Sequence, residues 1–345
     1  MIVVFALAAV IWGVGTLLNA PKSLRWGLIV VLLVAVIAAQ LTLPEGNPLR
    51  QATGDDARDW VFLLALGGVV FGYRRALKWL RARVAERDAK TEQPKGTFSE
   101  AELNRYARHM MLREIGGPGQ KKLKNARLLV IGAGGLGSSS LLYLAAAGVG
   151  TIGVVDDDVV DGSNLQRQVI HSDDRIGMPK VHSAAAAMRS LNPFIEVKPY
   201  HRRLSEEDAR LLFAEYDLIL DGTDNFETRY MVNRVATELG APLISAAMTQ
   251  WEGQISVYAP AEGGPCYQCV FPSAPAADLV PTCAEAGVLG PLPGIIGSMM
   301  AAEAIKYVTG AGQSLVGRIV IYDALYSETR VIQAKRRADC PICGD

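Results

Sequence analysis

The sequence predicts an α/β protein with a Rossmann-like, doubly wound sheet, preceded by helices that cross a membrane. Roughly the first eighty of the 345 residues contain long uncharged apolar runs, whereas the remainder has the composition of a soluble protein. A buried-strand pattern at 126–131 continues through a glycine-rich turn directly into a helix of small residues. Short strand-like segments then alternate with longer helical ones as far as residue 258.

Two N-terminal segments have the length and composition of transmembrane helices. Residues 1–20 and 26–43 contain no charged side chain, and each has about the 20 residues that a helix needs to cross the hydrocarbon of a bilayer. A cleaved signal peptide is the alternative for the first segment, but no basic stretch precedes it and two further apolar segments follow.

A third helix is expected at 60–80. Its apolar part is shorter, and it continues into basic side chains whose long stems can reach toward lipid headgroups. These are Arg74, Arg75, Lys78, Arg81 and Arg83. An amphipathic helix on the membrane surface is the alternative. Three crossings place Lys22, Arg25 and this basic run on the cytoplasmic side, which predicts a multi-pass protein of the inner or plasma membrane with a cytoplasmic soluble domain.

The chain is thereby divided into a membrane segment at 1–91, a polar linker at 92–97 and a soluble domain at 98–345. Lys and Arg together number 35, as do Asp and Glu, so the net charge is zero and general nucleic-acid binding is not expected. At the start of the soluble domain, Ser99 and Glu102 fit a capping box, which predicts a helix that runs through Arg108.

The glycine-rich turn at 132–137 predicts a phosphate-binding loop. Glycines let the backbone approach phosphates closely, and the following helix, expected at 138–147, offers unpaired N–H groups and the positive end of its dipole. A second strand at 151–155 ends at Asp156, where a carboxylate can bind ribose hydroxyls. On these features alone an NAD- or FAD-dependent oxidoreductase is the alternative, although no histidine or tyrosine set for hydride transfer is evident.

Polar side chains follow several of the predicted strands. Further strands are expected at 195–199, 217–220, 243–246 and 255–258. Asn164 and Arg167 come after Asp156, Lys180 follows them, and Asp224 comes after the strand that ends at residue 220. Such positions form the ligand site in open α/β sheets, where basic groups can neutralise a triphosphate and a carboxylate can hold Mg²⁺. A surface salt bridge between Arg167 and Asp224 is the structural alternative.

Four of the five cysteines form two C-x-x-C pairs. They are Cys266, Cys269, Cys340 and Cys343. Two such pairs can complete a tetrahedral four-thiolate Zn²⁺ site, which would be structural because no coordination position stays open. Redox pairs or disulfides are the alternative. The unpaired Cys283 is either a small buried residue or a nucleophile for an acyl or persulfide intermediate.

From about residue 98 to its end, the chain resembles the MoeB/ThiF/HesA adenylyltransferases of sulfur-carrier proteins, which share their fold with ubiquitin-activating enzymes. The motifs that carry the resemblance are 105–108, 132–137, 163–168, 222–225 and the paired C-x-x-C motifs, in that order. The combination is highly specific. The molybdopterin-synthase branch of the family is the most similar.

The resemblance implies ATP-dependent adenylation of the C-terminal glycine carboxylate of a ubiquitin-like sulfur-carrier protein, of the molybdopterin-synthase small-subunit type, with release of pyrophosphate. The residues implied to contact ATP are Gly132, Gly134 and Gly135, then Asp156 at the ribose, and Asn164, Arg167 and Lys180 at the phosphates. Asp224 would place Mg²⁺, and Arg108 would reach across a homodimer into the neighbouring site. The paired cysteines match the zinc ligands of the family.

The resemblance also leaves alternatives. Cys283 aligns with a cysteine that some relatives use covalently, as in a thiamine-type sulfur-carrier adenylyltransferase. The membrane segment is atypical of the family, so a catalytically silent module that tethers the carrier to a membrane is another reading. No rhodanese-like domain follows the zinc tail, and a separate protein is therefore expected to donate sulfur.

Overall fold

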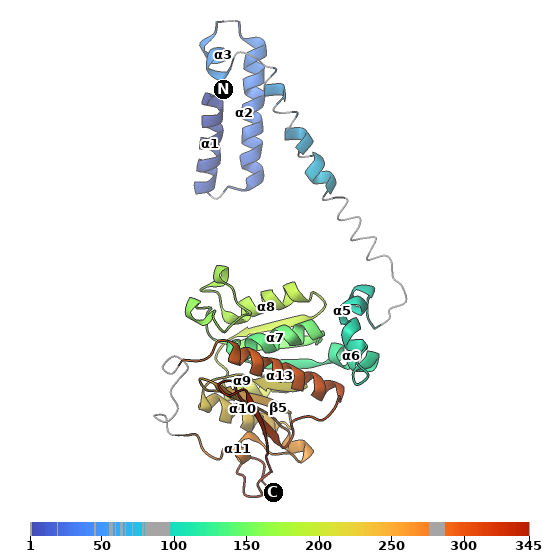
Figure 1. Cartoon of the computed structure of the whole chain (residues 1–345). Helices are drawn as coiled ribbons and strands as arrows, with labels where there is room; N and C mark the ends of the chain where they lie inside the picture. Colours follow the sequence, from blue (N-terminus) through green and yellow to red (C-terminus); the bar gives the residue numbers. More distant parts are fainter. Residues whose placement is uncertain are drawn as a thin grey trace. The chain divides into compact units, whose positions relative to one another are not determined.

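The computed structural model describes residues 2–79 with short gaps, residues 97–275 and residues 287–344 (Figure 1). The gaps lie at 19, 45, 55–57, 59, 63–64, 66, 71 and 78. The predicted linker, except Thr97, and Cys283 therefore lie outside the described residues. Contacts divide the chain into two compact units, residues 1–95 and 96–345, which are described separately.

The N-terminal unit consists mostly of apolar helices. Among the described residues they include α1 (Ile2–Leu17) and α2 (Lys22–Thr42), and the short helix α3 (Pro48–Thr53) follows. Among the described residues, two helical segments are long and apolar enough to cross a membrane, Leu24–Thr42 and Trp60–Leu77, while Val3–Leu17 is shorter. At the turn between α1 and α2, Arg25 donates to the carbonyl of Ala20 and lies 5.6 Å from the ring of Trp12.

The second unit is built on one eight-stranded sheet. Its strands are β1 (Arg127–Ile131), β2 (Thr151–Asp156), β3 (Glu196–His201), β4 (Leu218–Asp221), β5 (Leu243–Met248), β6 (Glu252–Tyr258), β7 (Arg318–Asp323) and β8 (Glu328–Gln333). The strand order is β3-β2-β1-β4-β5-β6-β7-β8. The first five strands in this order are parallel, and the chain leaves β1 to one side and later returns to its other side. The predicted doubly wound sheet is confirmed.

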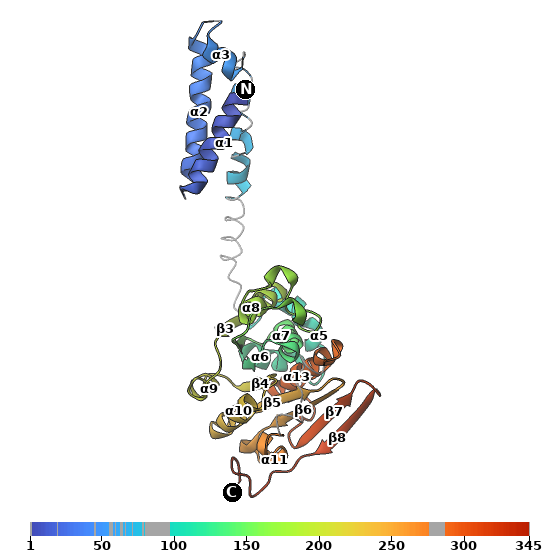
Figure 2. The ribbon, with the colours of Figure 1, turned by 90° about the vertical axis from the view of Figure 1, so that its left-hand side faces the viewer.

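The far edge of the sheet differs from the prediction. β6 pairs antiparallel with β5, and a β7–β8 hairpin extends the sheet beyond it (Figure 2). Only three residues, 249–251, separate β5 from β6, which is too short for the crossover that a parallel pair requires. The side chains of β8 are all exposed. Its sequence therefore lacks the run of apolar residues by which a core strand is predicted.

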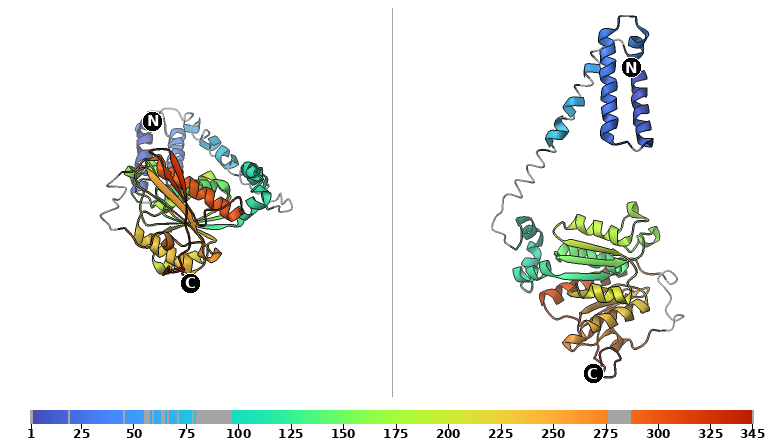
Figure 3. Two further views of the ribbon diagram at one scale, coloured as in Figure 1. Left: turned by 60° about the horizontal axis from the view of Figure 1, so that its bottom comes forward. Right: turned by 180° about the vertical axis from the view of Figure 1, so that it is seen from behind.

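Helices cover both faces of the sheet, as Figures 2 and 3 show. They are α5 (Glu100–Met110), α6 (Gly116–Asn125), α7 (Gly135–Ala147), α8 (Lys180–Leu191), α9 (Glu206–Phe213), α10 (Phe226–Glu238), α11 (Tyr267–Val270) and α13 (Pro291–Thr309). Leu128 and Val130 of β1 pack in a core with α7, α8 and α13. Leu129 and Ile131 pack on the opposite face with α9 and α10. This alternation is that of a strand buried on both faces.

Hydrogen bonds and an ion pair join helix α5 to the rest of the second unit. The predicted capping box is present, with Ser99 and Glu102 each bonding the backbone N–H of the other. Glu102 also accepts from Lys124 Nζ at 2.6 Å. Asn192 donates to the hydroxyl of Tyr106 at 2.8 Å. These contacts bind the helix to α6 and to the end of α8.

Candidate nucleotide site and cysteine cluster

The glycine turn connects β1 to α7 with its backbone tightly packed. Gly132 has φ +94°, a conformation that side chains rarely permit. A Cβ atom on Gly137 would lie 2.0 Å from the carbonyl oxygen of Gly132, so Gly137 has a packing requirement that the prediction did not include. α7 begins at Gly135 rather than at residue 138, and no side chain caps it. Its first N–H groups are therefore available to an anion.

Asp156 lies at the end of β2, beside this turn. Its Oδ2 accepts from the N–H of Ala133 at 2.7 Å, and its Oδ1 accepts from the N–H of Asp158 at 2.8 Å. Burial raises the pKa of the Asp156 carboxyl. The side chain is half-buried, so it has room for a further donor such as a ribose hydroxyl.

Lys180 is the first residue of α8, and its side chain is buried. Its Nζ donates to Oδ2 of Asp158 at 2.7 Å, and its backbone N–H donates to the carbonyl of Asp158 at 2.9 Å. Asp158 therefore connects Asp156 to Lys180. Asp158 was not among the site residues predicted from the sequence, although it lies only two residues after the end of β2.

Asn164 and Arg167 form a pair on the loop after β2. Arg167 Nη2 donates to Oδ1 of Asn164 at 2.6 Å. Among the described residues, Arg167 makes no ion pair with Asp224, so the salt bridge weighed as the alternative is not present.

Asp224 lies on the loop between β4 and α10. It is exposed and makes no hydrogen bond or ion pair with another described residue. Gly222 of the same loop packs against the glycine turn, since a Cβ atom on Gly132 would lie 3.2 Å from the carbonyl oxygen of Gly222. Because β2, β1 and β4 are neighbours, their carboxyl ends bring Asp156, the glycine turn and the loop of Asp224 to one edge of the sheet.

Arg108 is the exception among the predicted site residues. It is exposed on α5, where its guanidinium lies 3.9 Å from the sulfur of Met111, and within the described residues it makes no hydrogen bond to the groups at the sheet edge. The single chain thus brings the glycine turn, Asp156, Lys180 and the loop of Asp224 to one edge of the sheet. The Asn164–Arg167 pair lies on the loop after β2, and Arg108 has no contact with these groups among the described residues.

Two buried residues, His171 and Gln168, lie next to the glycine turn, and neither was predicted as a site residue, although Gln168 ends the motif at 163–168. His171 Nε2 donates to the carbonyl of Ala133, and its Nδ1 accepts from the hydroxyl of Ser183, both at 2.9 Å, since a carbonyl can only accept. Burial lowers the pKa of His171, which favours the neutral ring. Gln168 is also buried and would lie 3.6 Å from a Cβ atom on Gly134. A lone histidine carries no sequence signal for such a role.

The four paired cysteines are buried and gathered at one place. Their sulfurs lie within 4.8 Å of one another, with Cys266 Sγ 3.6 Å from Cys340 Sγ and Cys269 Sγ 3.3 Å from Cys343 Sγ. Four sulfurs bound at about 2.3 Å around a tetrahedral Zn²⁺ lie about 3.8 Å apart. The cluster therefore fits a four-thiolate zinc site, and none of its members is in a disulfide.

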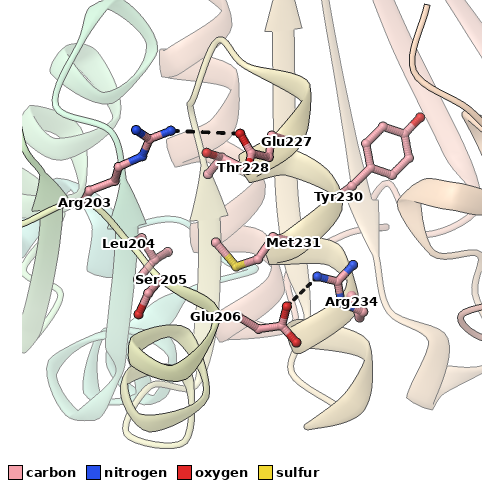
Figure 4. Close-up of a pocket in the computed structure, with 9 residues that line it drawn as sticks. All are labelled: Arg203, Leu204, Ser205, Glu206, Glu227, Thr228, Tyr230, Met231 and Arg234. Atoms are coloured by element: carbon pink, nitrogen blue, oxygen red, sulfur yellow. Dashed lines mark hydrogen bonds and ion pairs between the residues drawn. The ribbon is translucent and has the colours of Figure 1, made fainter.

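A separate groove of about 600 Å³, lined by both charged and apolar side chains, lies between α9 and α10 (Figure 4). Ion pairs join Arg203 to Glu227 at 4.0 Å and Glu206 to Arg234 at 2.6 Å. None of the predicted nucleotide-binding residues lines this groove.

Most of the second unit is similar in sequence to known proteins. The family model described as the ThiF family matches residues 106–342. A sulfur carrier protein adenylyltransferase of Thermus thermophilus is 46% identical over 252 residues, which are 72% of this chain and 93% of that protein. The SAMP-activating enzyme E1 of Haloferax volcanii is 46% identical over 244 residues, which are 71% of this chain and 90% of that protein.

Solved structures share the fold at lower identity. Escherichia coli MccB with ATP has a TM-score of 0.62 and 23% identity, covering 73% of this chain and 77% of MccB. PaaA has a TM-score of 0.62 and 22% identity, covering 76% of this chain and 83% of PaaA. At such identities the likeness concerns the α/β fold alone, and it agrees with the predicted fold class.

Proposed function

The chain belongs to the ThiF family, and from this premise we propose that it uses ATP to adenylate the C-terminal carboxylate of a small ubiquitin-like sulfur-carrier protein. One observation carries the proposal: the glycine turn, Asp156, Lys180 and Asp224 come from neighbouring strand ends and the helix that follows, around a single edge of the sheet. A nucleotide site at that edge has its phosphates at the start of α7. The names of the Thermus and Haloferax relatives support the choice of substrate.

In this reaction, an oxygen of the carrier carboxylate forms a bond to the α-phosphorus of ATP. The bond from that phosphorus to the bridging oxygen breaks, and pyrophosphate leaves with the electron pair. No covalent enzyme intermediate is required. Lys180 has three N–H donors, so it can keep Asp158 as a partner while it contacts a phosphate. Arg167 and Lys180 offset negative charge, and Arg108 of a second copy would complete the site.

Asp224 suits Mg²⁺, because it is a free carboxylate and Mg²⁺ takes hard oxygen ligands. When bound, the ion neutralises charge on the phosphates. Zn²⁺ is proposed at Cys266, Cys269, Cys340 and Cys343, where it would hold the C-terminal tail to α11.

We also propose that the carrier is of the molybdopterin-synthase small-subunit type, that the enzyme is a homodimer, and that a separate protein donates the sulfur. The N-terminal unit lies in a membrane, with Lys22 and Arg25 on the cytoplasmic side. Its support is the two long apolar helical segments and the outward-facing apolar side chains of α1 and α2. A thiamine-type enzyme that uses Cys283 covalently is the second candidate.

ATP–pyrophosphate exchange in the presence of purified candidate carriers tests this function. We expect the carrier to stimulate exchange and Asp224→Ala to abolish it while the fold is kept. Glu227→Ala is the matched control, since Glu227 is an exposed carboxylate three residues further along. Exchange that no carrier stimulates, or that Asp224→Ala leaves unchanged, would contradict the proposed reaction or the role of Asp224, respectively.

A further inference from the structure

Buried charged side chains hold the backbone next to Asp224. The neighbouring residue, Thr223, donates its N–H and its hydroxyl to Oδ1 of Asp221, at 3.0 and 2.7 Å. From the other side, Nη2 of Arg229 donates to the carbonyl oxygen of Thr223. Asp221 is fully buried and Arg229 is 5% exposed. The N–H, hydroxyl and carbonyl of Thr223 are thus all bonded by two buried ionisable residues.

Arg229 and Asp221 are connected to each other through β5. The hydroxyl of Ser245 accepts from Arg229 Nη1 at 3.3 Å and donates to Oδ2 of Asp221 at 3.2 Å. Arg229 Nη2 also donates to the carbonyl of Ala246 at 2.7 Å. Opposite charges that are buried and hydrogen-bonded in this way fix one geometry, and loss of one partner leaves the other uncompensated.

Arg229 is not placed to touch a ligand itself. The cavity beside its side chain, which Ser245 and Ala246 also line, has a volume of about 10 Å³. That is at the lower limit for one water molecule, so neither a nucleotide nor a hydrated metal ion fits there. Asp224 differs from it, being exposed and free of partners among the described residues. Any effect of Arg229 on ligands must therefore pass through the loop that it holds.

We propose that Arg229 is a positioning residue, which together with Asp221 fixes the loop at 222–225 so that Asp224 is presented to the Mg²⁺ of bound ATP. This inference rests on the proposed function. Without Arg229 the carboxylate of Asp224 is still present, but its backbone is no longer held on the carbonyl side of Thr223. The affinity for Mg²⁺ then falls, whereas saturating Mg²⁺ restores the rate.

The test uses the full chain and the variants Arg229→Met, Arg229→Lys and Ser245→Ala. Two quantities are measured against Mg²⁺ concentration, the rate of ATP–pyrophosphate exchange and the binding of a fluorescent ATP analogue. We expect the Mg²⁺ concentration for half-maximal exchange to rise about 10- to 100-fold in Arg229→Met, as for other residues that orient a metal ligand. The rise is smaller in Arg229→Lys, and the maximal rate recovers in both. Asp224→Ala does not recover at any Mg²⁺ concentration.

The outcomes separate this inference from the proposed function. Suppose that the wild type catalyses ATP–pyrophosphate exchange, but no variant changes its Mg²⁺ dependence or the rates of the Arg229 variants stay low at saturating Mg²⁺. Arg229 then does not position Asp224, and the proposed function stands. If the wild type shows no exchange, the proposed function fails, and binding of the ATP analogue decides the role of Arg229. Should Arg229→Met not fold, Ser245→Ala decides, because it removes a single hydroxyl.

Discussion

Oδ2 of Asp156 accepts a hydrogen bond of 2.7 Å from the backbone N–H of Ala133, which ties the end of β2 to the glycine turn. The other oxygen is bonded to the N–H of Asp158, so one side chain organises two loops at the ligand edge. Although burial raises the pKa of this carboxyl, both N–H groups favour its charged form.

Asp156→Ala is expected to weaken ATP binding about 10- to 100-fold, because hydrogen bonds to a charged group contribute about 1.5–3 kcal/mol. Asp156→Asn should lose less affinity for ATP, since the amide oxygen of asparagine can still accept one hydrogen bond. Titration with a fluorescent ATP analogue measures both. Asp157→Ala is the control, an exposed carboxylate next in sequence. An equal loss in this control would mean that net charge, and not the bonds of Asp156, sets the affinity.

His171→Gln is expected to reduce the pH dependence of stability. Burial lowers the pKa of His171 below its ordinary value near 6.5. Above pH 6.5 the ring is neutral in both states, and its contribution to stability is complete. As the pH falls below that value the unfolded chain binds a proton that the folded chain does not, so stability is lost. Glutamine can still donate to Ala133, but it does not titrate.

Thermal unfolding of the second unit between pH 8 and pH 5.5 measures this difference. The wild type should lose more stability on acidification than His171→Gln, and other titrating groups cancel in the comparison. His182→Gln is the control, an exposed histidine on α8. Parallel curves for the wild type and His171→Gln would show that another group sets the dependence.

Removal of zinc is expected to destabilise the second unit. Binding of structural Zn²⁺ contributes on the order of 10 kcal/mol, and loss of part of that lowers the melting temperature by roughly 10 °C or more. Cys340→Ser should therefore lose one Zn²⁺ per chain and melt earlier, which metal analysis and calorimetry measure. Ser273→Ala serves as a surface control. Purified protein that melts at the same temperature with and without a strong chelator would speak against a structural metal.

The full chain is expected to sediment with membranes and to resist a high-salt, alkaline wash, because its N-terminal helices expose apolar side chains. Residues 96–345 expressed alone should stay in the supernatant, since they form a separate compact unit. Release of the full chain by salt would indicate surface attachment through basic side chains instead of insertion.

The sequence predicted the strands at the centre of the sheet better than those at its edge. β1 and β2 are buried on both faces, so their β-branched runs stand out. β8 has no buried residue and offered no such signal. In the candidate site, Asp224 could be predicted from the sequence because it is a charged residue within the motif at 222–225. Asp158, His171 and Arg229 were missed because their roles depend on backbone partners that only the fold brings near.

The contacts of α5 have a mechanical consequence. This helix is the first element of the second unit, and the hydrogen bond from Asn192 to Tyr106 and the ion pair of Glu102 with Lys124 join it to the body of that unit. A pull from the N-terminal side would load first the hydrogen bond from Lys124 Nζ to the carbonyl oxygen of Thr97, and next these two contacts. The strain would then be absorbed there, at a distance along the chain from the glycine turn, and the candidate nucleotide site would keep its shape under tension.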